Sequence, residues 1–478
     1  MVHANAGRFL LAGALVVTLR APYDLAFHAV PGPLQGTPAT GELPRLYWKR
    51  FAGDSVRELW IRPNGVEVGL GADSAVHIRH ASTLHMGLVR KTLYWMPNDA
   101  EGDLRALRAM IAEAKLARVH GAPVRLLVTI HNPNVCVALF GNRAAAYRAF
   151  AERLRVLVRE DMADGVVDVP YWELFNEEDA DVEGTSTTSL FGARSPACNE
   201  GGASLQQQGT RYAEMLAVAY PVIRATSRNQ AMVVAGGLTN YRRANGRYER
   251  SYDFLRGIYA HPAGAQSFDI LAVHRYAVSG WTRAEETPLL EVLRANNDAE
   301  RPVWLTEFGY AWETYWDAHG GPPARDAVTV LDALQRDFVV GGVRDMRSAH
   351  VYDKAFIHSV CFRGDTTTAA AQRISAAVRR QNPAMNAGDV HYGLLRRDCS
   401  LGGAVNRRPA YEDLAQHDVN ATIGTVTTLP YLDVSAPGWQ PSGWAGQWTV
   451  LANGVVRLPA VPVSGGAMTR IVFTRTRR

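Results

Sequence analysis

The stretch VDVPYWELFNEE, residues 167–178, is a short run of branched and aromatic residues that ends abruptly in polar ones. Such a run is typical of a buried strand in a parallel sheet. Seven similar runs lie on either side of it between residues 65 and 356. We expect the other strands over Gly65–Leu70, Met86–Tyr94, Val124–His131, Met232–Leu238, Phe268–Tyr276, Pro302–Phe308 and Ser348–Tyr352.

Segments with apolar residues at helical spacing separate these runs. One is expected to begin with Asp103 as its N-cap, and another to begin near Arg325 and end at Gly341–Gly342. Alternating strands and helices are typical of β-α units around a parallel sheet. Eight such units predict an α/β protein with a (β/α)8 TIM barrel, whose functional residues follow the carboxyl ends of the strands.

The two ends of the chain differ from this pattern. After residue 417 the sequence has short β-rich runs, and Asn453–Gly454 between two of them is typical of a tight hairpin. We therefore expect an N-terminal segment over residues 1–64, the barrel over 65–416, and a small accessory β-sandwich-like domain over 417–478. The N-terminal segment also contains β-like stretches that could pack with that domain.

The composition narrows the class of protein. The 478 residues are 47% hydrophobic and 20% charged, which is typical of a globular protein. The net charge is +5 and no run of five or six like charges occurs, so no nucleic-acid partner is expected. The apolar run Phe9–Leu19 is too short for a membrane span. It has the length of a signal-peptide core, and a buried strand is the alternative.

Two of the expected strands end in a glutamate. Glu177 follows Asn176 in the fourth, and Glu307 lies within Thr306-Glu307-Phe308-Gly309 in the seventh. A barrel brings both to one mouth. Glycoside hydrolysis requires two carboxyl groups that face each other across the bond to be cut. A solvated loop residue or an ion-pair partner is the alternative for either glutamate alone, so a glycosidase is favoured only if further motifs match.

Further motifs occur in order along the barrel. They are Val89-Arg90 followed by Trp95, His131-Asn132, His274-Arg275-Tyr276, Tyr392-Gly393-Leu394-Leu395 with Asp398, and Arg408-Pro409-Ala410-Tyr411. Together with the two glutamate motifs, they resemble the retaining glycoside hydrolases of clan A, especially the cellulase-type family 5 and the β-xylosidase-type family 39. The resemblance extends over roughly residues 65 to 416.

The resemblance implies a role for each matching residue. Glu177 would be the general acid/base and Glu307 the nucleophile that forms a covalent glycosyl-enzyme intermediate on a β-linked carbohydrate. Arg90 and Tyr276 would stabilise the ionised nucleophile, and Asn176 would bind the hydroxyl beside the reacting carbon. The resemblance also implies a sugar subsite lined by His131, Asn132 and His274. This chemistry requires no metal and no organic cofactor.

Aromatic side chains bury the apolar faces of sugar rings. Trp95, Trp312 and Trp316 fall in expected loops of the catalytic face and are candidates for substrate contact, with loop packing as the alternative. The family usually has a tryptophan at the end of strand eight, which is absent from the expected strand here. Either Tyr352 takes that stacking role or the strand lies elsewhere.

A glycosidase has three alternatives. A metal-dependent barrel hydrolase would normally show an H-x-H motif on the first strand, whereas His77 and His80 fall on the expected first helix. A transglycosylase would use the same intermediate and pass the sugar to another sugar. A carbohydrate-binding barrel without turnover would have no need to keep both an acid and a nucleophile.

Four cysteines follow expected strands of the barrel. Once the barrel is assumed, adjacent loops could pair Cys136 with Cys198 and Cys361 with Cys399, and four free thiols are the alternative. Two such disulfides would indicate an oxidising compartment, so an extracellular or periplasmic enzyme is expected.

Overall fold

The computed structural model describes the strands, most helices and part of the loops. The described residues are 14–20, 24–30, 45–50, 56–62, 66–95, 99–131, 142–179, 204–239, 250–276, 286–310, 327–349, 351–361, 372, 376–377, 380–381, 393–395, 407–420, 431–433, 439–442, 449–450, 455–457 and 469–475. The chain divides into two compact units. One spans Gly65–Asn420, and the other combines Met1–Asn64 with Ala421–Arg478.

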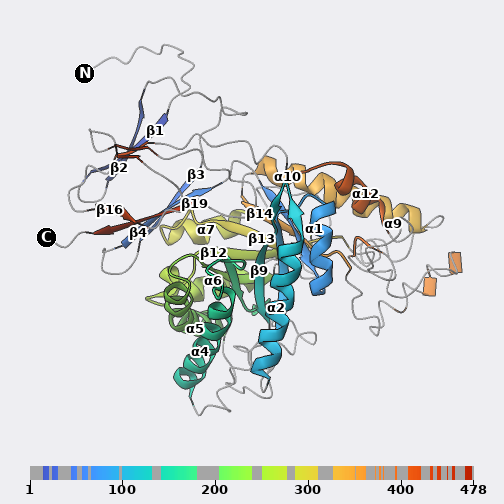
Figure 1. Ribbon diagram of the computed structural model, residues 1–478, viewed down its shortest axis with the longest axis horizontal. Helices are drawn as coiled ribbons and strands as arrows, with labels where there is room; N and C mark the ends of the chain where they lie inside the picture. The colour runs from blue at the N-terminus through green and yellow to red at the C-terminus, as the bar shows by residue number, and fades with distance from the viewer. Residues whose placement is uncertain are drawn as a thin grey trace. The chain divides into compact units, whose positions relative to one another are not determined.

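The larger unit contains a closed barrel of eight parallel strands (Figure 1). The strands follow one another around the barrel in chain order, and β14 pairs with β5 to close it. The predicted (β/α)8 fold is therefore confirmed. The strands are β5 (Glu67–Ala72), β6 (Leu88–Tyr94), β9 (Arg125–His131), β10 (Tyr171–Leu174), β11 (Met232–Thr239), β12 (Ile270–Arg275), β13 (Val303–Phe308) and β14 (Lys354–Ile357).

Helices flank the strands on the outside of the barrel (Figure 1). They are α1 (His80–Thr83), α2 (Ala100–Leu116), α4 (Arg143–Asp161), α5 (Leu205–Thr226), α6 (Arg250–Ala260), α7 (Thr287–Ala295), α9 (Ala327–Arg336), α10 (Gly342–Ala349) and α12 (Pro409–Gln416). The N-cap of α2 is Asp99, which accepts the N–H of Gly102 at 2.7 Å, and not Asp103 as predicted. Asp103 instead lies in the first turn, where it is buried and paired with Arg153 of α4.

The predicted eighth strand Ser348–Tyr352 is wrong. Residues 342–349 belong to α10, and the true strand β14 begins at Lys354. The predicted stop at Gly341–Gly342 is also wrong, because a π-helical turn over Asp337–Gly341 joins α9 to α10. Gly342 keeps the helical values φ −58° and ψ −34°, whereas a glycine that ends a helix usually adopts a positive φ. The helix therefore continues past both glycines.

The interior of the barrel is filled by large side chains below its mouth. The rings of Tyr171 and Trp304 lie 4.6 Å apart, and Phe356 lies 6.0 Å from Trp304. Lys354 pairs with Glu67 in the same interior, so both charges are compensated where water is excluded. A Cβ on Gly69 would approach the Phe356 ring to 2.7 Å, so only glycine leaves room for this ring.

The smaller unit is built from both ends of the chain. One sheet has the order β17-β18-β15-β1-β2 and the other the order β16-β19-β4-β3. Strands β17 and β18 pair antiparallel on either side of Asn453–Gly454, as the hairpin pattern predicts. The strands are β1 (Ala14–Arg20), β2 (Asp24–Val30), β3 (Arg45–Arg50), β4 (Val56–Arg62), β15 (Tyr431–Asp433), β16 (Trp439–Ser442), β17 (Thr449–Val450), β18 (Val455–Arg457) and β19 (Thr469–Arg475).

The apolar run Phe9–Leu19 overlaps β1, which matches the strand alternative for that part of the run. Residues 9–13 lie outside the described residues. Among the helices that the structure describes, none combines the length and the apolar character needed to cross a bilayer.

A buried carboxyl group ties α4 to the strand that follows it. Asp161 Oδ1 accepts the backbone N–H groups of Asp168 at 3.1 Å and Val169 at 3.0 Å. Burial, and to a smaller extent the charge of Asp168, raise the pKa of Asp161 to about 7. Because this pKa exceeds the unfolded value of about 4, the stability that the protonated group contributes is complete below pH 4 and is lost as the pH rises through 7.

Asp161→Asn is therefore expected to remove this loss while keeping an acceptor for both N–H groups. Relative to the wild type, the variant should gain up to about 4 kcal/mol of unfolding free energy between pH 4 and pH 8. Urea denaturation at the two pH values measures the gain. If the unfolding free energies of the variant and the wild type differ by the same amount at pH 4 and at pH 8, then Asp161 ionises normally in the folded protein.

Candidate active site

One buried guanidinium organises the mouth of the barrel. Arg90 of β6 donates from Nε to Glu173 Oε2 at 2.6 Å and from Nη2 to Asn176 Oδ1 at 2.8 Å. Its Nη1 donates to Glu307 Oε1. Arg90 thus holds three groups that come from the ends of two different strands.

Glu173 of β10 is a structural carboxylate. It is fully buried, and besides Arg90 it accepts the hydroxyl groups of Thr129 and of Thr306, the latter at 2.7 Å. Since both of its oxygens are engaged inside the barrel, its position fixes Arg90. The alternation of side chains along β10 accounts for this inward position.

Glu307 of β13 is surrounded by donors and positive charge. Tyr276 donates its hydroxyl to Oε2, while the Nδ1 atoms of His274 and His358 lie 3.5 Å and 3.7 Å from that oxygen. Burial alone would raise the pKa of Glu307, but the charges of the two histidines and of Arg90 outweigh it and lower this pKa far below its usual range. Glu307 is therefore an ionised carboxylate, as a nucleophile must be.

Glu177 reaches the site through an unusual backbone. Phe175 and Glu177 adopt positive φ values of 73° and 58°, a left-handed conformation that costs a non-glycine residue roughly 1 kcal/mol or more. The N–H of Glu177 donates to the carbonyl of Gly237 at 3.2 Å, which stabilises the turn. The turn directs the carboxyl of Glu177 toward His274 of β12, with 2.7 Å between Oε1 and Nδ1.

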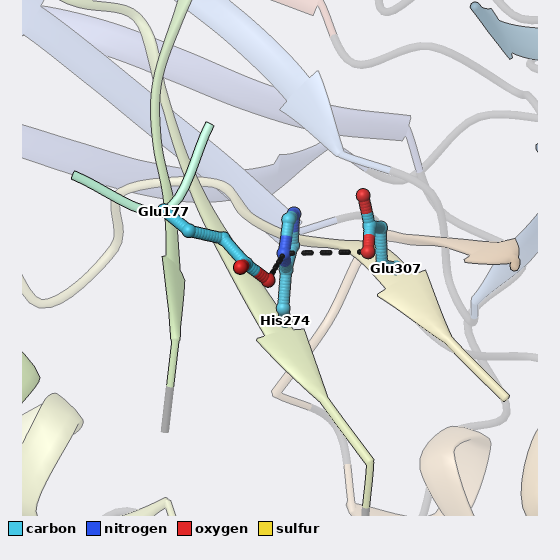
Figure 2. Close-up of side chains that lie close together, drawn as sticks. All are labelled: Glu177, His274 and Glu307. Atoms are coloured by element: carbon cyan, nitrogen blue, oxygen red, sulfur yellow. Dashed lines mark hydrogen bonds and ion pairs between the residues drawn. The ribbon is translucent and has the colours of Figure 1, made fainter. Parts of the chain in front are cut away.

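His274 lies between the two carboxyl groups (Figure 2). Burial opposes its charged form, but Glu307 and Glu177 outweigh burial and raise the pKa of His274. One oxygen of Glu177 and one of Glu307 lie within 4.8 Å of each other. The histidine therefore fixes the relative position of two carboxyl groups that have different surroundings.

Glu177, His274 and Glu307 could also offer three ligand atoms to a metal ion. A metal requires a neutral imidazole, whereas the raised pKa of His274 favours its protonated form. The guanidinium of Arg90 already donates to Glu307 and would repel a cation there. The surroundings of these three side chains therefore fit a proton-sharing network better than a metal centre.

Two residues predicted to contact substrate lie away from the mouth. Trp95 is buried against Phe150 of α4, with the guanidinium of Arg153 4.0 Å above its ring. It faces the helix layer because it is one residue out of phase with the inward-facing Arg90 and Tyr94. Tyr352 precedes β14 and donates its buried hydroxyl to Glu286, so its predicted stacking role is wrong.

The structure leaves several predicted residues untested. Asn132, Trp312 and Trp316 lie outside the described residues. So do Cys136, Cys198 and Cys399, whereas Cys361 is buried just after β14. Both cysteine pairings therefore stay predictions.

Two residues at the mouth were missed in the sequence. Tyr94 at the end of β6 is 62% exposed, and its ring meets the edge of His131 at 5.3 Å. Alternation from Arg90 through Thr92 to Tyr94 was the signal that could have found it. His358 follows β14, where the resemblance led us to expect tryptophan, and it was hidden by the misplaced eighth strand.

Arg90→Leu is expected to lower the unfolding free energy by about 3–5 kcal/mol, because two buried carboxylates lose their shared counter-charge. Arg108→Leu is the matched control, since Arg108 is half exposed and pairs with Glu160 at 2.7 Å on the surface. Its loss should lower the unfolding free energy far less than the loss of Arg90, because solvent screens this surface pair. Urea denaturation measures the unfolding free energy of both variants. Similar losses for Arg90→Leu and Arg108→Leu would show that the buried network contributes little to stability.

Comparisons with known proteins give similarity in fold at low identity. No protein-family model matches the chain, and no curated protein matches it. A family 39 glycoside hydrolase from the gut symbiont Bacteroides cellulosilyticus is 13% identical, with 88% of this chain and 87% of that chain covered and a TM-score of 0.44.

Two further structures are similar at the same level. A fungal β-1,4-galactanase is 12% identical over 73% of this chain and 98% of its own, with a TM-score of 0.44. A family 5 (GH5-4) broad-specificity endoglucanase from Clostridium acetobutylicum is 10% identical over 61% of this chain and 86% of its own, with a TM-score of 0.37.

Proposed function

We propose that the protein is a glycoside hydrolase that cleaves a β-linked carbohydrate with retention of configuration. The observation that carries the proposal is the pair Glu177 and Glu307, whose nearest oxygens lie within 4.8 Å at one barrel mouth. Retaining enzymes hold their two carboxyl groups about 5–5.5 Å apart, and inverting enzymes about 6.5–9.5 Å apart. The short separation supports direct attack by one carboxylate, because it is smaller than the span that inverting enzymes keep for a water.

In the first step, Glu307 attacks the anomeric carbon while the bond to the leaving oxygen breaks. Glu177 gives its proton to that oxygen, so the aglycone departs as a neutral alcohol. In the second step, ionised Glu177 takes a proton from water, and the resulting hydroxide displaces Glu307 from the sugar. Two inversions at one carbon give a product with the original anomeric configuration.

The residues around the pair have defined parts in this chemistry. Arg90 and Tyr276 hold the two oxygens of Glu307, so its attacking lone pair keeps one direction. Since Asn176 Oδ1 accepts from Arg90 at 2.8 Å, the amide NH2 of Asn176 is oriented to donate to a sugar hydroxyl. The exposed ring of Tyr94 offers an apolar surface on which a sugar face can stack.

A panel of aryl β-glycosides (glucoside, xyloside, mannoside, galactoside and cellobioside) tests the proposal. Release of the chromophore identifies the sugar, and proton NMR of the first product gives its anomeric configuration. A β-product supports the mechanism, and an α-product contradicts it. An added sugar acceptor that captures most of the glycosyl group would identify a transglycosylase. Sugar binding without turnover on the panel or on β-glucans, xylans, mannans and galactans would identify a carbohydrate-binding barrel.

Activity is expected to be insensitive to metal removal, because the protonated network between His274, Glu177 and Glu307 needs no cation. Dialysis against EDTA followed by assay should leave the rate unchanged. Loss of activity that Zn²⁺ or Mn²⁺ restores would instead show that the three side chains bind a metal.

A further inference from the structure

A second acid lies close to the catalytic glutamate. Asp179 follows Glu177 by two residues and is 2% exposed. Its Oδ1 accepts the backbone N–H of Thr239, the last residue of β11, at 2.9 Å. Its Oδ2 is also buried and has no hydrogen-bond partner among the described residues. A buried carboxyl group bound on one side only is unusual enough to need an explanation.

The contacts of Asp179 and Glu177 meet on the same strand. The N–H of Glu177 binds the carbonyl of Gly237, and Asp179 binds Thr239 two residues further along β11. Thr239 in turn lies opposite His274 in the pairing of β11 with β12. The turn is therefore hydrogen-bonded to β11 at two places, at Glu177 itself and at Asp179. Both places lie beside His274, which binds the carboxyl group of Glu177.

We propose that Asp179 is a positioning residue that, through its bond to Thr239 of β11, holds the proton-donating oxygen of Glu177 at the leaving-group oxygen. This inference rests on the proposed function and adds a residue to it. Burial, and then the charge of Glu177, raise the pKa of Asp179 to about 7, although the bond from Thr239 opposes the rise. Glu177 of the same turn and His274 of β12 are the titratable groups that act on it most strongly.

A positioning role for Asp179 has a specific kinetic consequence. Protonation by Glu177 matters when the leaving group is a poor one, such as another sugar, and hardly matters for 2,4-dinitrophenolate. A displaced Glu177 therefore slows the first step for a disaccharide but not for a dinitrophenyl glycoside. The ratio kcat/KM reports this first step, so it separates positioning of the acid from general damage to the fold.

The experiment compares Asp179→Ala and Asp179→Asn on a β-disaccharide and on the dinitrophenyl glycoside of the same sugar. We expect Asp179→Ala to lose about 100-fold in kcat/KM on the disaccharide, the effect of a displacement of about 1 Å, and less than 3-fold on the dinitrophenyl substrate. Asp179→Asn keeps the acceptor for Thr239 without a charge, so it should stay within about 3-fold of the wild type on both.

The control is Asp161→Ala, which removes another buried aspartate that accepts backbone N–H groups but lies far from the mouth. It should lower stability without changing the ratio of the two substrates. If Asp179→Ala loses kcat/KM equally on both substrates, or on neither, the inference is overturned while the proposed function stays intact. Asp179→Glu, which moves the carboxyl by one methylene, replaces Asp179→Ala if that variant does not fold. A wild type inert on both substrates would overturn the proposed function and the inference with it.

Discussion

Glu307→Ala is expected to lower the turnover of the best aryl β-glycoside by at least about 10⁴-fold, because no other ionised carboxylate in the described site can reach the anomeric carbon. Glu173 is fully buried and bound on both oxygens, so it cannot replace the missing group. The rate of chromophore release measures the loss.

Azide should restore part of this activity. The small anion can enter the space left by the carboxylate, where the charges of Arg90, His274 and His358 attract it. Because azide attacks the glycoside directly, the product should be a glycosyl azide of inverted configuration. Residual activity above about one per cent without azide would contradict the role of Glu307, and so would an azide product of retained configuration.

Glu177→Ala is expected to have an effect that depends on the leaving group. For a disaccharide, kcat/KM should fall by about 10³-fold or more, whereas for a dinitrophenyl glycoside it should change by less than about 10-fold. Azide should then give a glycosyl azide of retained configuration, because it intercepts the intermediate on Glu307. The two glutamate variants should therefore give glycosyl azides of opposite anomeric configuration, so each variant is a control for the other.

Glu178→Gln is the matched control for Glu177. Glu178 is adjacent in sequence and buried, but its charge acts on Tyr212 of α5, outside the barrel. The change in kcat/KM that Glu178→Gln causes should be the same for the disaccharide and for the dinitrophenyl glycoside. If instead Glu178→Gln shows the dependence and Glu177→Ala does not, the acid has been assigned to the wrong neighbour.

The sequence was most informative where strands are apolar up to their ends. The run before Glu307 contains only apolar residues and one threonine, so both the strand and its terminal glutamate could be predicted. The turn at Glu177 could not, because positive φ at Phe175 and Glu177 depends on contacts with β9 and β11. Simple alternation along β10 accounts for Glu173 inside the barrel but says nothing about a residue beyond such a turn.

The eighth strand shows why a pattern of apolar residues can mislead. β14 begins with Lys354 and follows Asp353, so its sequence looks polar at the point where the strand starts. Only the partner Glu67, 287 residues earlier, makes a lysine acceptable inside the barrel. A buried ion pair between distant residues therefore made the strand hard to recognise, and with it His358 beside Glu307.

The strands β5 and β14, which close the barrel, are made far apart in time during synthesis of the chain. Lys354 and Glu67 are separated by 287 residues, so at 5–20 residues per second β5 waits roughly 15–60 s on the ribosome for its partner strand. During that time one edge of the growing sheet lacks the neighbour that will complete its hydrogen bonds, and such an edge can pair with other nascent chains. We therefore expect the yield of folded protein to rise with added chaperones and with a lower expression level, even if the finished barrel is stable.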